Sequence, residues 1–228
     1  MGTSSITSPF FCHVPTTLTM QFIAHTASTL SCFDASGSTR SIASRIAFNY
    51  CLPDDSLEAR ANEERHAADA GRVYSSGVWR DAGAQRRLVD ALGPALAGGL
   101  HDDFEWYRCR GAFFHNDAHY DNRLFGVWCI SGPPADLVFP RASLRIDITP
   151  GNIAVFDPFE VHGILLRDAT HFSATDYEAV AATVLLGFEL DLTAKIAAAF
   201  GIAAGINGPM ISSRTRISAA TGAFDSLN

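Results

Sequence analysis

The chain has 228 residues, of which 47% are hydrophobic and 18% are charged, and its formal net charge at pH 7 is -7. A chain of this length buries about 70% of the surface that it exposes when unfolded, so it can fold as one structural domain without a disulfide or a structural metal. The negative charge argues against a nucleic-acid partner, because phosphate binding usually requires a basic face. No apolar run approaches the roughly 18 residues that a membrane-spanning helix needs. We therefore expect neither a nucleic acid nor a membrane as partner.

The residue composition and the missing motifs argue against further classes of protein. The chain has 16 arginines and one lysine, Lys195, and no phosphate-loop, dinucleotide-binding or nucleophile-elbow motif. The usual sequence signals of nucleotide-binding proteins and α/β-hydrolases are therefore missing. The five cysteines are odd in number and widely spaced, which predicts free thiols in a reducing compartment. Because the N-terminus also lacks the pattern of a secretory signal, we expect a cytoplasmic location.

The first hundred residues predict a support region for a larger core. Residues 1–52 are rich in Ser and Thr and indicate a tail with peripheral strands. A helical region is expected over residues 53–100, where Asp54 and Asp55 are candidate N-caps. The expected helices cover residues 57–70 and 84–92, and Gly93-Pro94 interrupts the second one.

Beyond residue 101 the pattern changes to short β-type runs separated by turn residues. These runs cover residues 104–114, 123–130, 137–139, 143–148, 152–156, 162–166 and 181–190. Seven strands at this spacing are typical of a β-sandwich or barrel. We expect this mainly β core over residues 101–206, closed by an Ala-rich helix at 192–200 and followed by a loose C-terminal tail at 207–228.

The strongest chemical signal is the segment Phe113-Phe-His-Asn-Asp-Ala-His-Tyr-Asp-Asn122. In an extended chain, residues i and i+2 lie on the same face about 6.5 to 7 Å apart, so His115 and Asp117 can point at one metal ion. His162, which opens a later predicted strand, can supply a third ligand. Two imidazoles and one carboxylate leave adjacent positions of an ion open, as in non-haem Fe(II) oxygenases.

The H-x-D pattern by itself is weak evidence, since it occurs three times, beginning at His101, His115 and His119. The strands on either side favour the triplet at His115. His119 with Asp121 is an alternative ligand pair in a shifted register, and the triplet at His101 is interpreted as a helix-to-strand turn. A surface location without any metal is a further interpretation of these residues.

On His115-x-Asp117, the stretch Pro150-Gly-Asn-Ile-Ala-Val-Phe-Asp157 and His162, the sequence over about residues 104–190 resembles a known family. This family is the double-stranded β-helix, or jelly-roll, family of Fe(II)- and 2-oxoglutarate-dependent oxygenases. The resemblance implies a jelly-roll barrel with flanking helices and a catalytic iron held by His115, Asp117 and His162. It also implies 2-oxoglutarate as cosubstrate, with dioxygen and a small or amino-acid-like molecule as substrates; a homodimer is left open.

One feature of that family is missing from this chain. The family often has an Arg about ten positions after the second histidine, which pairs with the far carboxylate of 2-oxoglutarate, but residue 172 is Phe. As the anchor we rank Arg123 first and Arg167 second, with Tyr107 as a hydrogen-bonding helper. Two other functions stay open: a metal-dependent cupin-type isomerase, lyase or cosubstrate-free dioxygenase, and a non-catalytic jelly-roll binding domain.

Overall fold

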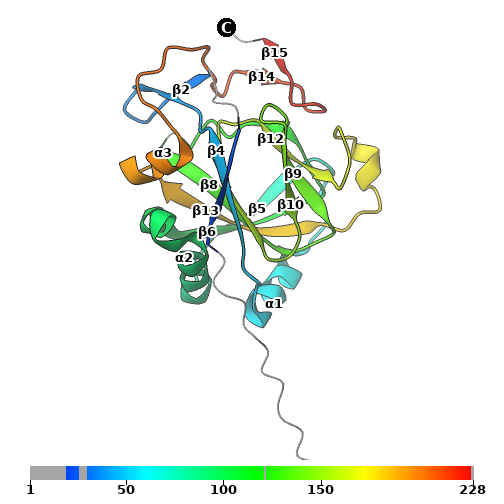
Figure 1. The fold of residues 1–228 in the computed structure, drawn as a ribbon. Helices are drawn as coiled ribbons and strands as arrows, with labels where there is room; N and C mark the ends of the chain where they lie inside the picture. The colour runs from blue at the N-terminus through cyan, green and yellow to red at the C-terminus, as the bar shows by residue number, and fades with distance from the viewer. Residues whose placement is uncertain (1–18, 26–29, 121, 227–228) are drawn as a thin grey trace, which may run out of the picture.

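Two antiparallel β-sheets form the centre of the molecule (Figure 1). The computed structural model describes residues 19–25, 30–120 and 122–226. The larger sheet has the order β1 (Gln21–Ala24), β4 (Arg45–Tyr50), β11 (Asn152–Phe156), β8 (Arg123–Ser131), β13 (Thr183–Asp191), β6 (Leu100–Cys109) and β5 (Val73–Trp79). The smaller sheet has the order β10 (Leu144–Ile148), β9 (Ala135–Phe139), β12 (His162–Leu166) and β7 (Ala112–His115). This arrangement confirms the predicted fold class, a mainly β double-stranded β-helix with flanking helices.

Strand alternation explains how the larger sheet is buried on both faces. Val127 and Cys129 of β8 point between the two sheets, whereas Trp128 and Ile130 point to the opposite face. Because both faces of β8 are covered, its sequence is a nearly continuous apolar run rather than an alternating one.

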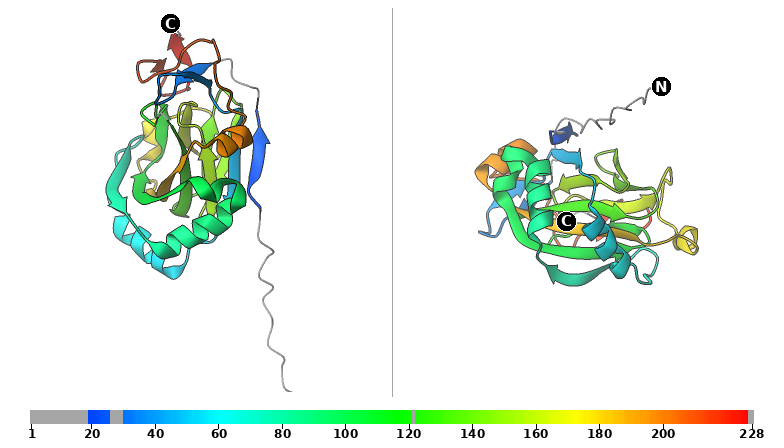
Figure 2. Two further views of the ribbon diagram at one scale, coloured as in Figure 1. Left: turned by 90° about the vertical axis from the view of Figure 1, so that its left-hand side faces the viewer. Right: turned by 90° about the horizontal axis from the view of Figure 1, so that it is seen from below.

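Three helices cover the outer face of the larger sheet: α1 (Asp55–Glu64), α2 (Ala82–Leu96) and α3 (Ala194–Phe200). Figures 1 and 2 show α2 and α3 on one side of the barrel and α1 at its lower end. The side chains of Asp54 and Asp81 accept N–H bonds in the first turns of α1 and α2, which fixes where these helices begin. Leu88 and Leu92 of α2 are buried in the same core cluster as Trp106 of β6. Two single 3₁₀ turns, η1 (Ala97–Gly99) and η2 (Ala174–Tyr177), complete the helical elements.

The structure differs from the sequence-based expectations in the first half of the chain. The expected strand at 104–114 is divided into β6 and β7, which belong to different sheets. Gly111 lies between them with a φ of 65°, and the ring of Tyr177 packs where its Cβ would be, so the chain can turn there. β5 lies in the region expected to be helical, and β4 has neighbours on both sides in the larger sheet instead of being peripheral.

The C-terminal region also differs from the loose tail expected after residue 207. Strands β14 (Arg216–Ile217) and β15 (Phe224–Ser226) pair in a small antiparallel sheet, which lies above β12 in Figure 1. The side chain of Ile211 is buried against residues near β2 (Ser31–Phe33) and β3 (Thr39–Ser41). The few apolar residues of this segment are too widely spaced to form a periodic pattern, so no local pattern predicts their burial.

No helix in the described part of the chain has the length and apolar character needed to cross a membrane. Among the same residues, no disulfide joins any two cysteines, and Cys12 lies outside them. Burial raises the pKa of the Cys109 and Cys129 thiols to about 12. These two thiols therefore stay protonated at neutral pH and are unsuited to nucleophilic or metal-binding roles.

Candidate metal centre

Two neighbouring strands of the smaller sheet carry the histidines of the site. His115 ends β7, His162 begins β12, and the two residues are direct partners in the antiparallel register. Asp117 follows in the next loop, where its backbone N–H donates to the Pro158 carbonyl at 2.8 Å. This bond ties the loop after β7 to the turn before β12. The structure therefore brings together the three side chains that the sequence singles out as ligands.

Each of the three side chains offers one ligand atom, and these atoms all lie within 4.8 Å of one another. Asp117 Oδ1 lies 3.8 Å from His115 Nε2, and Asp117 Oδ2 lies 3.5 Å from His162 Nε2. Each imidazole donates its Nδ1 proton to a backbone carbonyl, His115 to Phe113 at 2.7 Å and His162 to Glu160 at 2.9 Å. The Nδ1 atoms are therefore engaged by the backbone, and the Nε2 atoms, which lie next to the carboxylate, are the ring nitrogens available to a metal.

The electrostatics of the site favour the protonation states that a metal requires. Burial, together with the nearby His162, lowers the pKa of His115, so its imidazole is neutral at pH 7. Burial alone would raise the pKa of Asp117, but the contacts with His162 and His115 hold it below its usual value. A neutral imidazole and an ionised carboxylate bind a divalent ion without first losing a proton. The two imidazole nitrogens and the carboxylate therefore fit a divalent ion in the kind of donor atoms, in the position of the imidazole protons and in charge.

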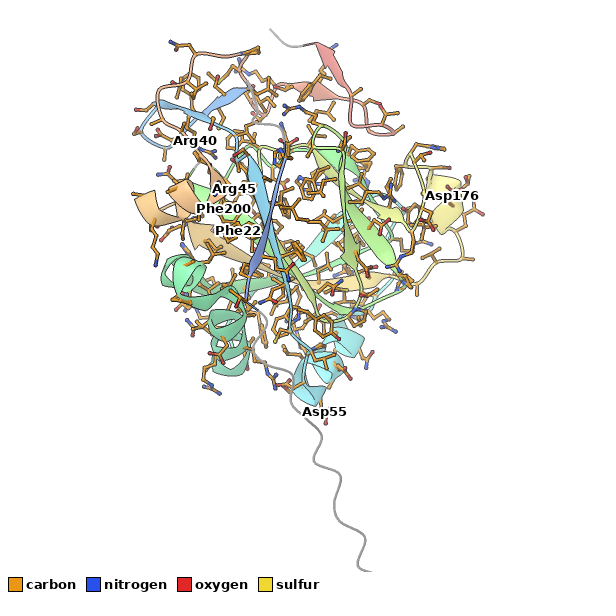
Figure 3. The ribbon with its side chains drawn as sticks, viewed as in Figure 1. Phe22, Arg40, Arg45, Asp55, Asp176 and Phe200 are labelled. Carbon is orange, nitrogen blue, oxygen red and sulfur yellow. The ribbon has the colours of Figure 1, made fainter. Side chains whose placement is uncertain are left out.

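A buried ion pair fixes the turn that leads into His162. Arg40 Nη1 donates to Asp157 Oδ2 at 2.6 Å, and the two side chains are 4% and 0% exposed. The same carboxylate accepts the backbone N–H groups of Ala43 and Phe159. Arg40 is the middle residue of β3, which pairs with β2, and is labelled in Figure 3. Sequence reasoning missed this pair because its partners are far apart in the chain and share no local pattern.

A cavity of about 320 Å³ adjoins the three side chains; we call it the chamber. Its apolar wall consists of Val73, Ala112, Phe125, Val127, Leu137, Phe156, Ile164 and Leu185. Its polar lining, apart from the candidate ligands, consists of Ser75, Glu105, Tyr107, His119 and Tyr120. Burial raises the pKa of both tyrosines, so their hydroxyls stay protonated and can donate hydrogen bonds. No arginine or lysine of the described chain lines the chamber.

The residues predicted to anchor 2-oxoglutarate lie in different places in the structure. Tyr107 lines the chamber, but the guanidinium of Arg123 pairs with Glu189 and that of Arg167 pairs with Asp147. Neither arginine is among the chamber residues, although Arg123 lines a cavity next to the chamber; their role as anchors stays a prediction. Strand alternation places Arg123 on the inner face, but at the very start of β8, where it lines a cavity next to the chamber.

The alternative ligand pair finds no support among the described residues. His119 is exposed at the chamber edge, where its ring centroid lies 4.1 Å from that of Tyr120. Asp121 lies outside the described residues. His101 bonds to Asp191 at 2.7 Å, in keeping with a structural role at the start of β6. Within the described ranges, His115, Asp117 and His162 form the one group able to hold a metal.

No protein-family model matches this chain, and no curated protein matches it in sequence. Solved structures with a similar fold include a cupin superfamily protein from Desulfitobacterium hafniense, which is 11% identical over 63% of this chain and 97% of its own, with a TM-score of 0.33. A 2OG-Fe(II) oxygenase family oxidoreductase from Burkholderia pseudomallei is 14% identical over 65% of this chain and 86% of its own, with a TM-score of 0.40. A prolyl-4-hydroxylase from Pseudomonas putida is 17% identical over 65% and 92%, also with a TM-score of 0.40. At these identities the likeness concerns the fold alone.

Proposed function

We propose that this chain is a metal-dependent oxygenase that holds Fe(II) through His115, Asp117 and His162 and oxidises a small molecule with dioxygen. The observation that carries the proposal is the convergence of two Nε2 atoms and one carboxylate on the wall of the chamber. Iron held by such a set of ligands supplies dioxygen chemistry, because the ligands occupy one side of the ion and leave adjacent positions open.

The remaining chamber residues bind the substrate and keep water away. The apolar wall favours a substrate with an apolar body, since burying such a body between Phe125, Phe156 and Leu185 removes it from water. The Tyr107 hydroxyl interacts with Glu105 and Tyr120, and the Tyr120 hydroxyl is a hydrogen-bond donor that can orient a polar group of that substrate. His119 stands at the edge of the chamber and borders the entrance.

We further propose that the reaction proceeds without 2-oxoglutarate. That cosubstrate would bring a second carboxylate into an apolar chamber that no described arginine or lysine lines, and Arg123 of the adjoining cavity already pairs with Glu189. A buried carboxylate without a cationic partner costs several kcal/mol, which would prevent useful affinity. A 2-oxoglutarate-dependent hydroxylase is the second candidate. It is favoured by the order H-x-D then His along the chain and by the two tyrosine hydroxyls.

Anaerobic titration with Fe(II), followed by 2-oxoglutarate, tests both candidates. We expect one iron per chain in the wild type and a large loss of affinity in His162→Ala. We also expect no visible charge-transfer band on adding 2-oxoglutarate and, in air, no succinate above the level of the His162→Ala control. A band together with succinate would establish the second candidate instead, and a wild type that binds no iron would overturn both. The cytoplasmic location, the small-molecule substrate and self-association as a homodimer stay predictions.

A further inference from the structure

A second cavity, of about 240 Å³, adjoins the chamber on the inner face of the larger sheet; we call it the vestibule. Glu105, Tyr107 and Phe125 line both cavities, so the two share a common wall. The vestibule is more polar, because the neighbouring strands contribute charged side chains at this end of the sheet. A ligand that fills both spaces would therefore meet an apolar region next to the candidate ligands and a charged region farther out.

The charges in the vestibule are balanced except at one residue. Of its carboxylates, Asp103 pairs with Arg80 and Glu189 pairs with Arg123. Glu105 accepts a hydrogen bond from Ser75 Oγ at 2.7 Å and interacts with the Tyr107 hydroxyl, but no ion pair joins it to any cation in the described part of the chain. In the chamber the corresponding carboxylate is Asp117, which the proposed metal would neutralise. Among the described residues that line these two adjoining cavities, Glu105 is thus the carboxylate that lacks a counter-charge.

Glu105 is also placed where one molecule can reach both it and the candidate metal ligands. It lies two residues before Tyr107 on β6, on the same face and about 6.5 to 7 Å away along the strand. From Tyr107 a row of aromatic contacts leads to the site. Ring centroids are 5.8 Å apart for Tyr107 and Phe125, 5.8 Å for Phe125 and Phe156, and 4.7 Å for Phe156 and His162. An apolar body lying along these rings links a group at Glu105 with a position beside His162.

We propose that Glu105 is a specificity-determining residue that selects a substrate with an amine at one end and an apolar body at the other. The ammonium group pairs with the Glu105 carboxylate and lies near the faces of Tyr107 and Phe125, which also attract a cation. The apolar body fills the chamber, so that its far end is the part presented for oxidation. An anionic substrate is disfavoured, because its charge would meet Glu105 without a cation to offset it. This inference rests on the proposed function only for the statement of which end reacts.

Binding of three matched probes to the full chain, measured calorimetrically under anaerobic conditions with Fe(II) and again without it, tests the inference. The probes are 3-phenylpropan-1-amine, 3-phenylpropan-1-ol and 3-phenylpropanoate, which differ in charge but little in shape. We expect the amine to bind at least about tenfold more tightly than the alcohol, which corresponds to about 1.4 kcal/mol, and the carboxylate to bind most weakly. Glu105→Gln should remove the preference for the amine. The matched control is Asp102→Asn, which removes the same charge from an exposed neighbour on β6.

Equal affinity for the amine and the alcohol, or no amine binding at millimolar concentration, would overturn the proposal. So would a Glu105→Gln variant that keeps the wild-type preference. Iron titration of the same proteins separates this inference from the proposed function. Normal iron binding without amine selectivity means that the inference fails alone. Amine selectivity that depends on Glu105, in a protein that binds no iron, means that the proposed function fails alone.

Discussion

At the scale of single residues, the site depends on where two imidazole protons are held. The Phe113 and Glu160 carbonyls accept the Nδ1 protons of His115 and His162, so the backbone sets the direction of both Nε2 lone pairs. The H-x-D spacing predicts that His115 and Asp117 can share a face, but it does not predict which backbone carbonyls accept the Nδ1 protons. The candidate ligands could therefore be predicted from the sequence, whereas their tautomers required the structure.

Removing a candidate ligand should abolish tight metal binding. Removing a hydrogen-bond partner of a metal ligand typically lowers the metal affinity by about 10- to 100-fold. We therefore expect His115→Ala, Asp117→Ala and His162→Ala each to lower the iron affinity by more than about 100-fold. His101→Ala, whose imidazole bonds to Asp191, is the matched control and should bind iron as the wild type does. Anaerobic competition with a chromophoric chelator measures the affinities. Wild-type affinity in His162→Ala would contradict the assignment.

One glycine determines the space available to Tyr107. A Cβ added at Gly187 would lie 2.1 Å from the Tyr107 ring, so Gly187→Ala must displace that ring within the chamber. We expect a loss of about 1 to 3 kcal/mol in the free energy of unfolding, as for other overpacked sites, together with weaker binding of the phenylpropylamine probe. Gly98→Ala is the control, because nothing lies within 4 Å of its Cβ position. Urea denaturation and calorimetry measure the two effects, and unchanged probe binding in Gly187→Ala would refute this view of the chamber.

At the scale of elements, the turn between β11 and β12 is held from a distant part of the chain. Removing Arg40 leaves the Asp157 carboxylate buried without its partner, and breaking such a pair typically costs about 3 to 5 kcal/mol. We expect a loss of this size in the free energy of unfolding of Arg40→Met, measured by urea denaturation. The exposed pair of Arg167 and Asp147 is the control, and Arg167→Met should lose less than about 1 kcal/mol. Similar losses in both variants would show that Arg40 does not hold the turn.

At the scale of the whole molecule, the sequence predicts the barrel better than the parts that surround it. The runs at residues 123–130, 152–156 and 162–166 are apolar, bounded by turn residues and close to the observed strands. β5 was missed because its sequence, VYSSGVW, is mostly exposed at the sheet edge and does not alternate clearly. The vestibule was missed for a different reason. It is built by pairing between β6, β8 and β13, and no local pattern encodes which strands become neighbours.

The C-terminal segment packs over the end of the barrel that carries the site, and no local pattern in the sequence predicts this contact. Ile211 is 1% exposed and belongs to a cluster with Leu30, Ile42 and Phe159, the last of which lies in the turn before His162. Ala118, beside Asp117, packs against the same cluster. The loop that bears Asp117 and the turn that precedes His162 therefore both rest on a core that Ile211 completes.

Truncating Ile211 should consequently affect both the stability and the metal site. We expect Ile211→Ala to lower the free energy of unfolding by about 2 to 5 kcal/mol, the usual range for a buried aliphatic side chain. Iron affinity should fall as well, although no ligand is altered, because the turns at Asp117 and Phe159 lose a shared support. Val89→Ala, at a 40% exposed position of α2, removes apolar atoms elsewhere and should change neither quantity appreciably. Urea denaturation and anaerobic iron titration at a temperature where both variants are folded measure the two effects. An Ile211→Ala protein that is destabilised but binds iron as tightly as the wild type would show that the C-terminal segment stabilises the fold without positioning the site.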